Sequence, residues 1–241
     1  MENNSDRPTL SISQKTGYGR VVLHGPWETS YADFFLNADY QSLTINTSRG
    51  FSGSDLDFLE EVPNLKELAI FGSINDVSAI GSVDSLEILN IQVDCKFGAD
   101  LQTLQKLEEL FVDDKSARGF EALPVLQSLY VYGFSGADLS RFTCGSLKAL
   151  RIGPARKLTS LSGLSDSLNA QISDLGVYYA PRLVDYLPLE RMLSLETLEF
   201  DHCKICSYSG GGSTRPGWVG CRGGARGVIG FGGAGAAGVV A

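Results

Sequence analysis

The stretch "LKELAIFGSINDVSAIGSVDSLEILNI", residues 65–91, contains nearly the same phrase twice. The phrase LKELAI at 65–70 returns as LEILNI at 86–91. It recurs as LEELFV from 107, LQSLYV from 126 and LKALRI from 147, so the spacings are 21, 21, 19 and 21 residues. Several copies at a fixed period of this length indicate a repeat architecture.

Weaker copies extend the series on both sides. They lie at 40–45, 172–177 and 195–200, and they bring the total to about eight units. The register is least regular between Ile152 and Leu195. Alternate side chains of an extended segment point to opposite faces, so the second and third apolar residues of each phrase are predicted to face a core. One unit cannot bury that core alone, and stacked units can.

The pattern L-x-x-L-x-[IV] resembles the leucine-rich repeat family over residues 40–201. The connector at 74–83 is similar to the short class of about 21 to 22 residues found in internalins and phosphatase-regulating repeat proteins. The resemblance implies an α/β solenoid with a parallel β-sheet on its concave face and short turns or helices on its convex face. The asparagine typical of the family is replaced by Ser73, Asp94, Lys115, Phe134, Ala155 and Cys203.

Four segments are predicted along the chain. Residues 1–18 read as a flexible lead, 19–39 as an N-terminal cap, 40–206 as the repeat solenoid, and 207–241 as a Gly-rich tail. From 210 onward 13 of 32 residues are glycine, and ordering so much glycine costs much backbone entropy. We expect the tail to be disordered, or to be the product of a shifted reading frame, an unspliced segment or a cloning artefact. A genuine flexible linker is the open alternative.

Composition narrows the class of partner. Lys and Arg total 20 and Asp and Glu total 28, so the net charge is −8, which disfavours nucleic acid. The first residues carry no apolar run, so neither a secretory signal nor a membrane span is expected and a cytoplasmic location is predicted. The five cysteines form no closely spaced framework and are expected to be free thiols. A monomer is expected.

Catalytic and cofactor signals are incomplete. The two histidines, His24 and His202, lie at opposite ends of the array, and the G-x-G-x-x-G at 230–235 has too little chain after it for a dinucleotide site. No enzyme activity, cofactor or metal is therefore predicted. One alternative remains in "DHCKIC", where Asp201, His202, Cys203 and Cys206 are ligand types for an enzyme or a zinc site. A closed zinc site needs four ligands, and Cys203 also suits the solenoid interior.

Function is expected on the outward positions of the strands. The aromatic residues predicted there are Phe71, Phe111, Tyr130 and Tyr132, and the charged ones are Glu67, Glu109, Asp113, Arg151, Glu199 and Asp201. Aromatic anchors within a polar rim are typical of a protein-binding hot spot. The prediction is a non-catalytic protein-interaction scaffold with a partner of basic character. An immunity-type inhibitor that masks a basic enzyme or toxin, and a fragment of a longer repeat protein, are alternatives.

Overall fold

The chain is a mixed α/β protein whose strands are mostly parallel and whose helices are few. The computed structural model describes residues 7–36, 39–203, 227–230 and 239–240. It divides into two compact units, Met1–Leu126 and Gln127–Ala241, which are described separately below.

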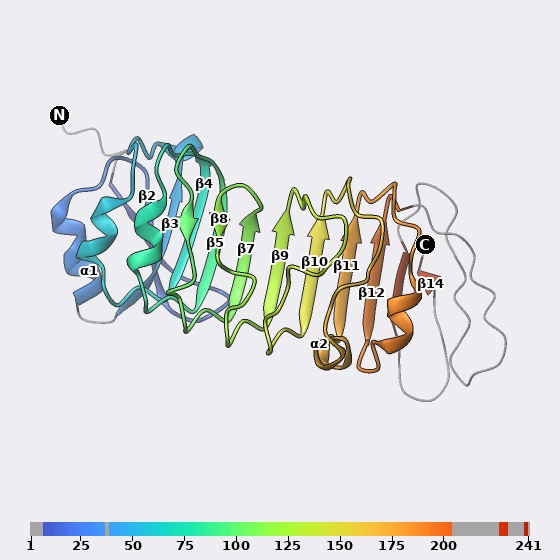
Figure 1. The fold of residues 1–241 in the computed structure, drawn as a ribbon. Helices are drawn as coiled ribbons and strands as arrows, with labels where there is room; N and C mark the ends of the chain where they lie inside the picture. The colour runs from blue at the N-terminus through green and yellow to red at the C-terminus, as the bar shows by residue number, and fades with distance from the viewer. Residues whose placement is uncertain (1–6, 37–38, 204–226, 231–238, 241) are drawn as a thin grey trace. The chain divides into compact units, whose positions relative to one another are not determined.

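Unit 1 contains six strands of the main sheet (Figure 1). In sheet order they are β1 (Thr9–Ile12), β2 (Gly19–Leu23), β3 (Tyr40–Asn46), β4 (Glu67–Ser73), β5 (Ile88–Asp94) and β7 (Glu109–Asp113). The β1–β2 pair is antiparallel, and the pairs from β2 to β7 are parallel. A second small sheet joins β6 (Ala99–Asp100) to β8 (Ala117–Arg118).

Unit 2 continues the same pattern with four parallel strands. These are β9 (Ser128–Tyr132), β10 (Ala149–Gly153), β11 (Asp174–Tyr178) and β12 (Thr197–Asp201). Two short antiparallel strands follow, β13 (Gly227–Gly230) on β12 and β14 (Val239–Val240) on β13. Both fall in the Gly-rich stretch for which the sequence predicts disorder or an artefact, and the rest of that stretch lies outside the described residues.

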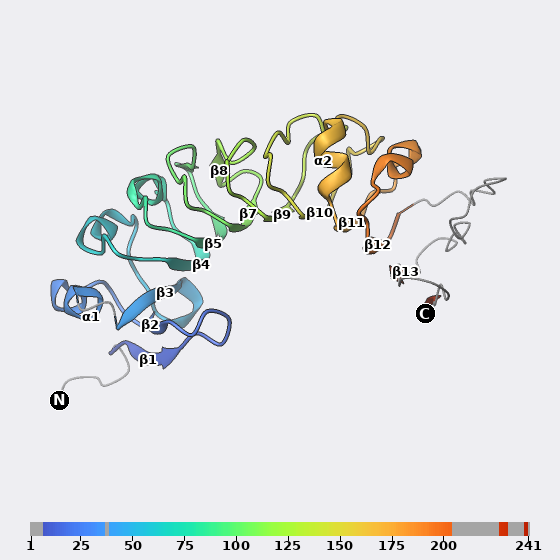
Figure 2. The same ribbon diagram turned by 90° about the horizontal axis from the view of Figure 1, so that it is seen from below.

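The connectors between strands are short. Among the described residues the α-helices are α1 (Asp33–Leu36) and α2 (Asp166–Gln171), and the 3-10 turns are η1 (Thr29–Ala32), η2 (Thr47–Arg49), η3 (Asp57–Glu61), η4 (Ser78–Ser82) and η5 (Leu187–Arg191). Within each unit they lie on one side of the strands (Figure 2). Ser165 caps the α2 helix: its side chain accepts a hydrogen bond from the Leu168 amide and so satisfies a free donor of the first turn.

The copies of the repeated phrase pair residue for residue. In unit 1 Leu68, Leu89 and Leu110 are neighbours across β4, β5 and β7, and all three are at most 3% exposed. In unit 2 the corresponding row runs Leu129, Leu150, Leu175 and Leu198, each at most 1% exposed. The core of each unit therefore lies between the inward side of the strands and their connectors. The irregular stretch after Ile152 keeps this register, since Leu150 lies beside Leu175.

At three of the positions where the resemblance to leucine-rich repeats predicts an asparagine, unit 2 has buried apolar groups. Phe134, Ala155 and Cys203 are buried, and the Phe134 ring stacks on Phe142 at 5.6 Å. These side chains therefore contribute to the apolar packing of unit 2. In unit 1 Ser73, Asp94 and Lys115 are exposed.

The N-terminal segment differs from the flexible lead predicted for residues 1–18. From Thr9 onward it forms a hairpin, because β1 pairs with β2 and the loop between them bends back on itself. The Ser13 amide donates to the Tyr18 carbonyl at 2.7 Å, and the Gly17 amide donates to the Ser13 carbonyl at 2.9 Å. Gly17 supplies the left-handed backbone, with φ 76°, that this turn requires.

Candidate functional site

The outward face of the sheet is the side opposite the buried leucines. In unit 1 its residues form three rows across the strands. The first row is Ser42, Glu67, Ile88 and Glu109; the second is Thr44, Ala69, Asn90 and Phe111; the third is Asn46, Phe71 and Gln92. The predicted Glu67 and Glu109 thus share the first row, while Phe111 and Phe71 belong to the second and third.

The first row is covered by the loop between β1 and β2. We call this loop, residues 13–18, the strap. Lys15 Nζ forms an ion pair with a Glu109 carboxylate oxygen, and Thr16 Oγ1 donates to Glu67 Oε2 at 2.9 Å. A third contact joins Tyr18 Oη to Glu87 Oε2 at 2.9 Å. The strap therefore crosses the repeats and contacts one glutamate from each of three successive phrases.

Glu67 is the most enclosed of these acids, with its side chain only 9% exposed. Its Oε1 accepts from Arg20 Nη2 at 3.0 Å, and the same nitrogen donates to Ser13 Oγ at 2.9 Å. Burial alone would raise the pKa of Glu67, but hydrogen bonds from Ser13 and Thr16 and the charge of Arg20 outweigh it and lower the pKa. Glu67 is therefore a charged internal anchor of the hairpin.

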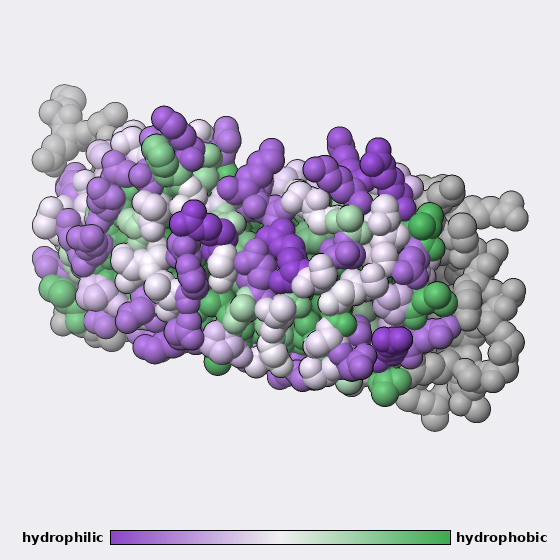
Figure 3. Space-filling model, in the orientation of Figure 1, coloured by the Kyte–Doolittle hydropathy of each residue, from purple (hydrophilic) through white to green (hydrophobic). Residues whose placement is uncertain are grey.

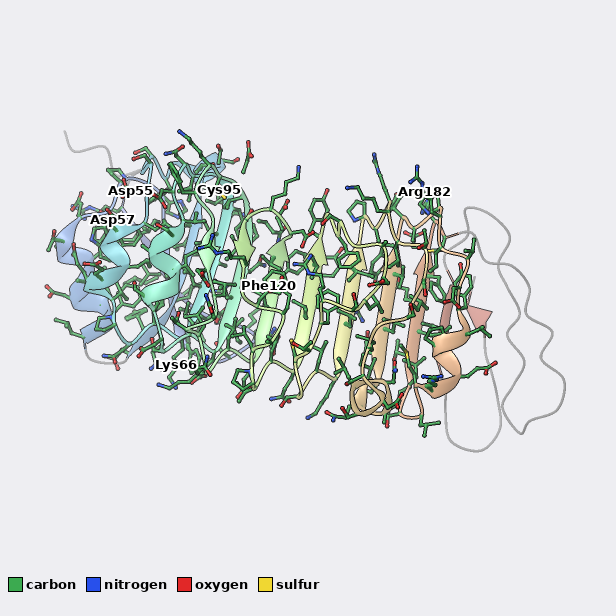
Figure 4. The ribbon with its side chains drawn as sticks, in the orientation of Figure 1. Asp55, Asp57, Lys66, Cys95, Phe120 and Arg182 are labelled. Carbon is green, nitrogen blue, oxygen red and sulfur yellow. The ribbon has the colours of Figure 1, made fainter. Side chains whose placement is uncertain are left out.

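Glu87 is held in a similar way at the amino ends of the strands. Lys66, labelled in Figure 4, places its Nζ 2.9 Å from Glu87 Oε1 and lies above the Tyr18 ring at 5.5 Å. The hydrogen bond from Lys66 is the main reason why the pKa of Glu87 is lowered. The sequence analysis did not select Glu87, because it lies just before β5 and not at an outward position of a strand.

The second and third rows of unit 1 carry the aromatic residues. Phe71 and Phe111 are half-buried, Gln92 is exposed, and its Nε2 donates to Asn90 Oδ1 at 3.0 Å. Asp113 at the end of β7 is half-buried. The second and third rows therefore place two aromatic rings beside the side-chain amides of Asn90 and Gln92.

Unit 2 has a corresponding set of rows. They are Ser128, Ala149, Asp174 and Thr197; then Tyr130, Arg151, Gly176 and Glu199; then Tyr132, Gly153, Tyr178 and Asp201. The second row brings together three of the predicted residues, Tyr130, Arg151 and Glu199. Tyr132 lies in the third row and is 48% exposed.

Charged and phenolic groups in unit 2 form one connected cluster. Arg151 binds Asp174 through two contacts, Nε to Oδ1 at 3.1 Å and Nη2 to Oδ2 at 2.9 Å. Tyr178 Oη donates to Glu199 Oε2 at 2.7 Å, and the Tyr178 ring packs edge-to-face on Tyr130 at 6.2 Å. The bidentate geometry fixes the guanidinium in place. The predicted Arg151 and Glu199 are thus engaged by neighbours within the unit.

Gly176 is what lets the Tyr178 ring reach Glu199. A β-carbon at Gly176 would lie 2.8 Å from Tyr178 Oη and 3.0 Å from Arg151 Cγ, so a larger residue would push one of these side chains out of its present position. Burial, followed by the hydrogen bond to Glu199, raises the pKa of Tyr178. Its hydroxyl therefore stays protonated and acts as a donor. Tyr178 was not among the predicted site residues, although "VYY" at 177–179 is an aromatic signal in the irregular stretch.

A second aromatic pair lies beyond the ends of β11 and β12. The Tyr179 and His202 rings stack at 4.4 Å, and His202 Nδ1 lies 2.6 Å from Asp201 Oδ1. Both residues have left-handed backbones, with φ 51° and 53°. Such a conformation costs energy for a residue other than glycine. This pair was also not predicted as part of the outward face.

The "DHCKIC" group gives no support to a metal or thiolate site. Cys203 is buried, its thiol donates to the Val177 carbonyl at 3.3 Å, and burial raises its pKa. A raised pKa disfavours the thiolate that zinc or redox chemistry needs. Cys206 lies outside the described residues. Within the described ranges no three His, Cys, Asp or Glu residues are placed to hold a metal ion.

The remaining surface is mixed. On the side drawn in Figure 3 hydrophilic residues predominate, and hydrophobic ones appear in small groups. Exposed apolar side chains away from the strands include Phe97 in unit 1 and Val184, Leu187 and Leu193 in unit 2. In the part of the chain that the structure covers, no helix is long and apolar enough to cross a membrane.

Comparison with known proteins gives no match: no family model, no curated protein and no solved structure is significantly similar to this chain.

Proposed function

We propose that this chain is a non-catalytic interaction protein that binds another protein on the outward face of its strands. The supporting observation is that aromatic rings occupy outward positions although the inward positions already form a complete apolar core. Phe71 and Phe111 in unit 1 are half-buried, and Tyr132 in unit 2 is 48% exposed. Rings of this kind, surrounded by polar groups, are the usual anchors of protein interfaces.

We also propose that the chain folds as a leucine-rich repeat solenoid. Its support is the period of the phrase together with the residue-for-residue pairing of successive copies. Such an array presents a row of equivalent side chains on each strand, and repeat proteins use these rows to bind extended surfaces. A monomeric chain in the cytoplasm is part of the same proposal.

A partner with basic character fits best. The net charge is −8, and Glu109 and Asp113 lie beside Phe111 on β7. Complementary charge accelerates association and favours a correctly oriented complex, and salt weakens both effects. The complex is therefore expected to weaken as ionic strength rises.

The test is to capture the partner from native lysate on the immobilised chain and then to measure its Kd with purified variants. Phe111→Glu and Tyr132→Glu each place a charge among the outward rings. Their matched controls are Phe97→Glu and Leu187→Glu, at positions that are 49% and 64% exposed and lie off the strands.

We expect at least about a tenfold loss of affinity for one or both outward variants, the effect of removing a hot-spot residue, and less than about twofold for the controls. Equal effects of outward and control variants, with all four proteins folded, would refute binding on this face.

A further inference from the structure

The strap already shows what chemistry the first row of unit 1 and the neighbouring Glu87 accept. It is a tight turn that places a lysine on Glu109, a hydroxyl on Glu67 and a phenol on Glu87. These contacts join residues far apart in the chain, up to 94 positions for Lys15 and Glu109. One piece of the chain therefore lies on the outward face as a ligand would.

The contacts of the hairpin differ in strength along its length. Arg20 belongs to β2, and its bond to the enclosed Glu67 is built into the sheet. Lys15 is 52% exposed and its partner Glu109 is 37% exposed, so water and salt screen their attraction. Gln14 and Gly17 are exposed, as is all of β1. The tip of the strap, from Gln14 to Gly17, can therefore detach at Lys15 while Arg20 keeps β2 and the buried Ser13 in place.

We propose that the strap is an internal competitor for the partner. A basic segment of the partner replaces Lys15 on Glu109 and Thr16 on Glu67, and the tip of the strap swings away as it binds. This inference rests on the proposed function, since it names the kind of segment that the face recognises. It also predicts that the strap weakens binding, because each partner molecule must first displace it.

The place of the strap also decides which outward side chains a partner meets first. The strap contacts described above fall on the first row and on Glu87, while Phe71 and Phe111 lie in the other rows, where the first encounter takes place. A partner then anchors on the rings and competes for the acids. The strap makes the site selective for basic segments, because a segment without positive charge cannot take the place of Lys15 on Glu109.

The probe for the test is a decalysine peptide at low ionic strength, with decaglutamate as the control peptide. Lys15→Ala frees Glu109 and raises the net negative charge by one. Lys96→Ala makes the same change of charge at a lysine that lies over the Phe97 ring, outside the strap. Hydrogen–deuterium exchange of residues 10–18 reports on the strap directly, because the Ser13 and Gly17 amides are hydrogen-bonded in the closed hairpin.

We expect Lys15→Ala to bind decalysine about three- to fivefold more tightly than the native chain, the range for losing an exposed ion pair, and Lys96→Ala to change affinity by less than about 1.5-fold. Adding decalysine should speed exchange in residues 10–18 of the native chain, and decaglutamate should not.

Two results would overturn the inference and leave the proposed function standing. One is decalysine binding that Glu109→Gln weakens, without faster exchange in the strap and without a gain from Lys15→Ala. The other is a captured partner that depends on Phe111 although no form of the chain binds decalysine. If substitutions at Phe111 and Tyr132 also leave the Kd of the partner unchanged, the proposed function fails together with the inference about the strap.

Discussion

Glu67→Gln is expected to lower the free energy of unfolding of unit 1 far more than a substitution at an exposed position would. The change keeps the size of the side chain and removes its charge, so Arg20 and Thr16 lose the carboxylate that they bind at 3.0 and 2.9 Å. Hydrogen bonds to a charged group contribute about 1.5–3 kcal/mol each, and the Arg20 side chain keeps partial contact with water at 29% exposure. We therefore expect the free energy of unfolding to fall by about 2 kcal/mol at pH 7.

Urea unfolding measures this loss. Trp27 fluorescence in a Trp218→Phe background follows unit 1, because the Trp27 ring stacks on Phe58 at 4.3 Å. With a slope of about 2 kcal/mol per molar urea, the midpoint should shift by about 1 M. Glu109→Gln is the matched control and should cost less than about 1 kcal/mol, because its ion pair with Lys15 is exposed.

The same pair of variants gives a pH test of known sign. The pKa of Glu67 is lower in the folded chain than the ordinary value of 4.5, so its charge stabilises the fold above about pH 5 and this contribution disappears as the pH falls through the folded pKa. The gap between the native chain and Glu67→Gln should therefore narrow below pH 4.5. A cost no larger than that of Glu109→Gln, or a gap that does not narrow in acid, would refute the reasoning.

Three further predictions concern unfolding free energy. Tyr178→Phe should cost unit 2 about 1–2 kcal/mol by removing the 2.7 Å hydrogen bond to Glu199. Because the pKa of Tyr178 is raised on folding, that loss should shrink as the pH rises above about 10, and a loss that grows with pH would contradict it. Gly176→Ala should cost about 1–2 kcal/mol in thermal unfolding by displacing the Tyr178 ring; a neutral result would mean that the ring is not held there. Leu89→Ala should cost about 3 kcal/mol in urea and its neighbour Asn90→Ala less than about 0.5, and similar costs would mean that the strand faces are assigned wrongly.

The strands and their inward residues could be predicted from the sequence because apolar periodicity and burial have the same cause. Leu68 and Leu89 occupy equal places in the phrase and are neighbours across two strands. The outward positions then follow from strand alternation, which is why Phe111 and Tyr132 could be named from spacing alone.

The strap could not be predicted in this way. Its contacts depend on the antiparallel pairing of β1, and the phrase does not extend to that part of the chain. The ion pair between Lys15 and Glu109 spans 94 positions and follows no period. The position of Tyr178 over Gly176 could not be predicted for another reason. It depends on glycine having no side chain two residues earlier on the same strand, and a hydrophobic pattern carries no information about that space.

Site-specific photo-cross-linking in native lysate tests binding on the outward face most directly. A benzophenone amino acid is placed in turn at the outward positions Phe71, Phe111 and Tyr132. The control positions are Phe97 and Leu187, which are exposed and lie off the strands. If the outward face binds the partner, one and the same protein is cross-linked from at least one outward position and from neither control. Cross-links from Phe97 or Leu187 alone would place the partner elsewhere and contradict the proposal.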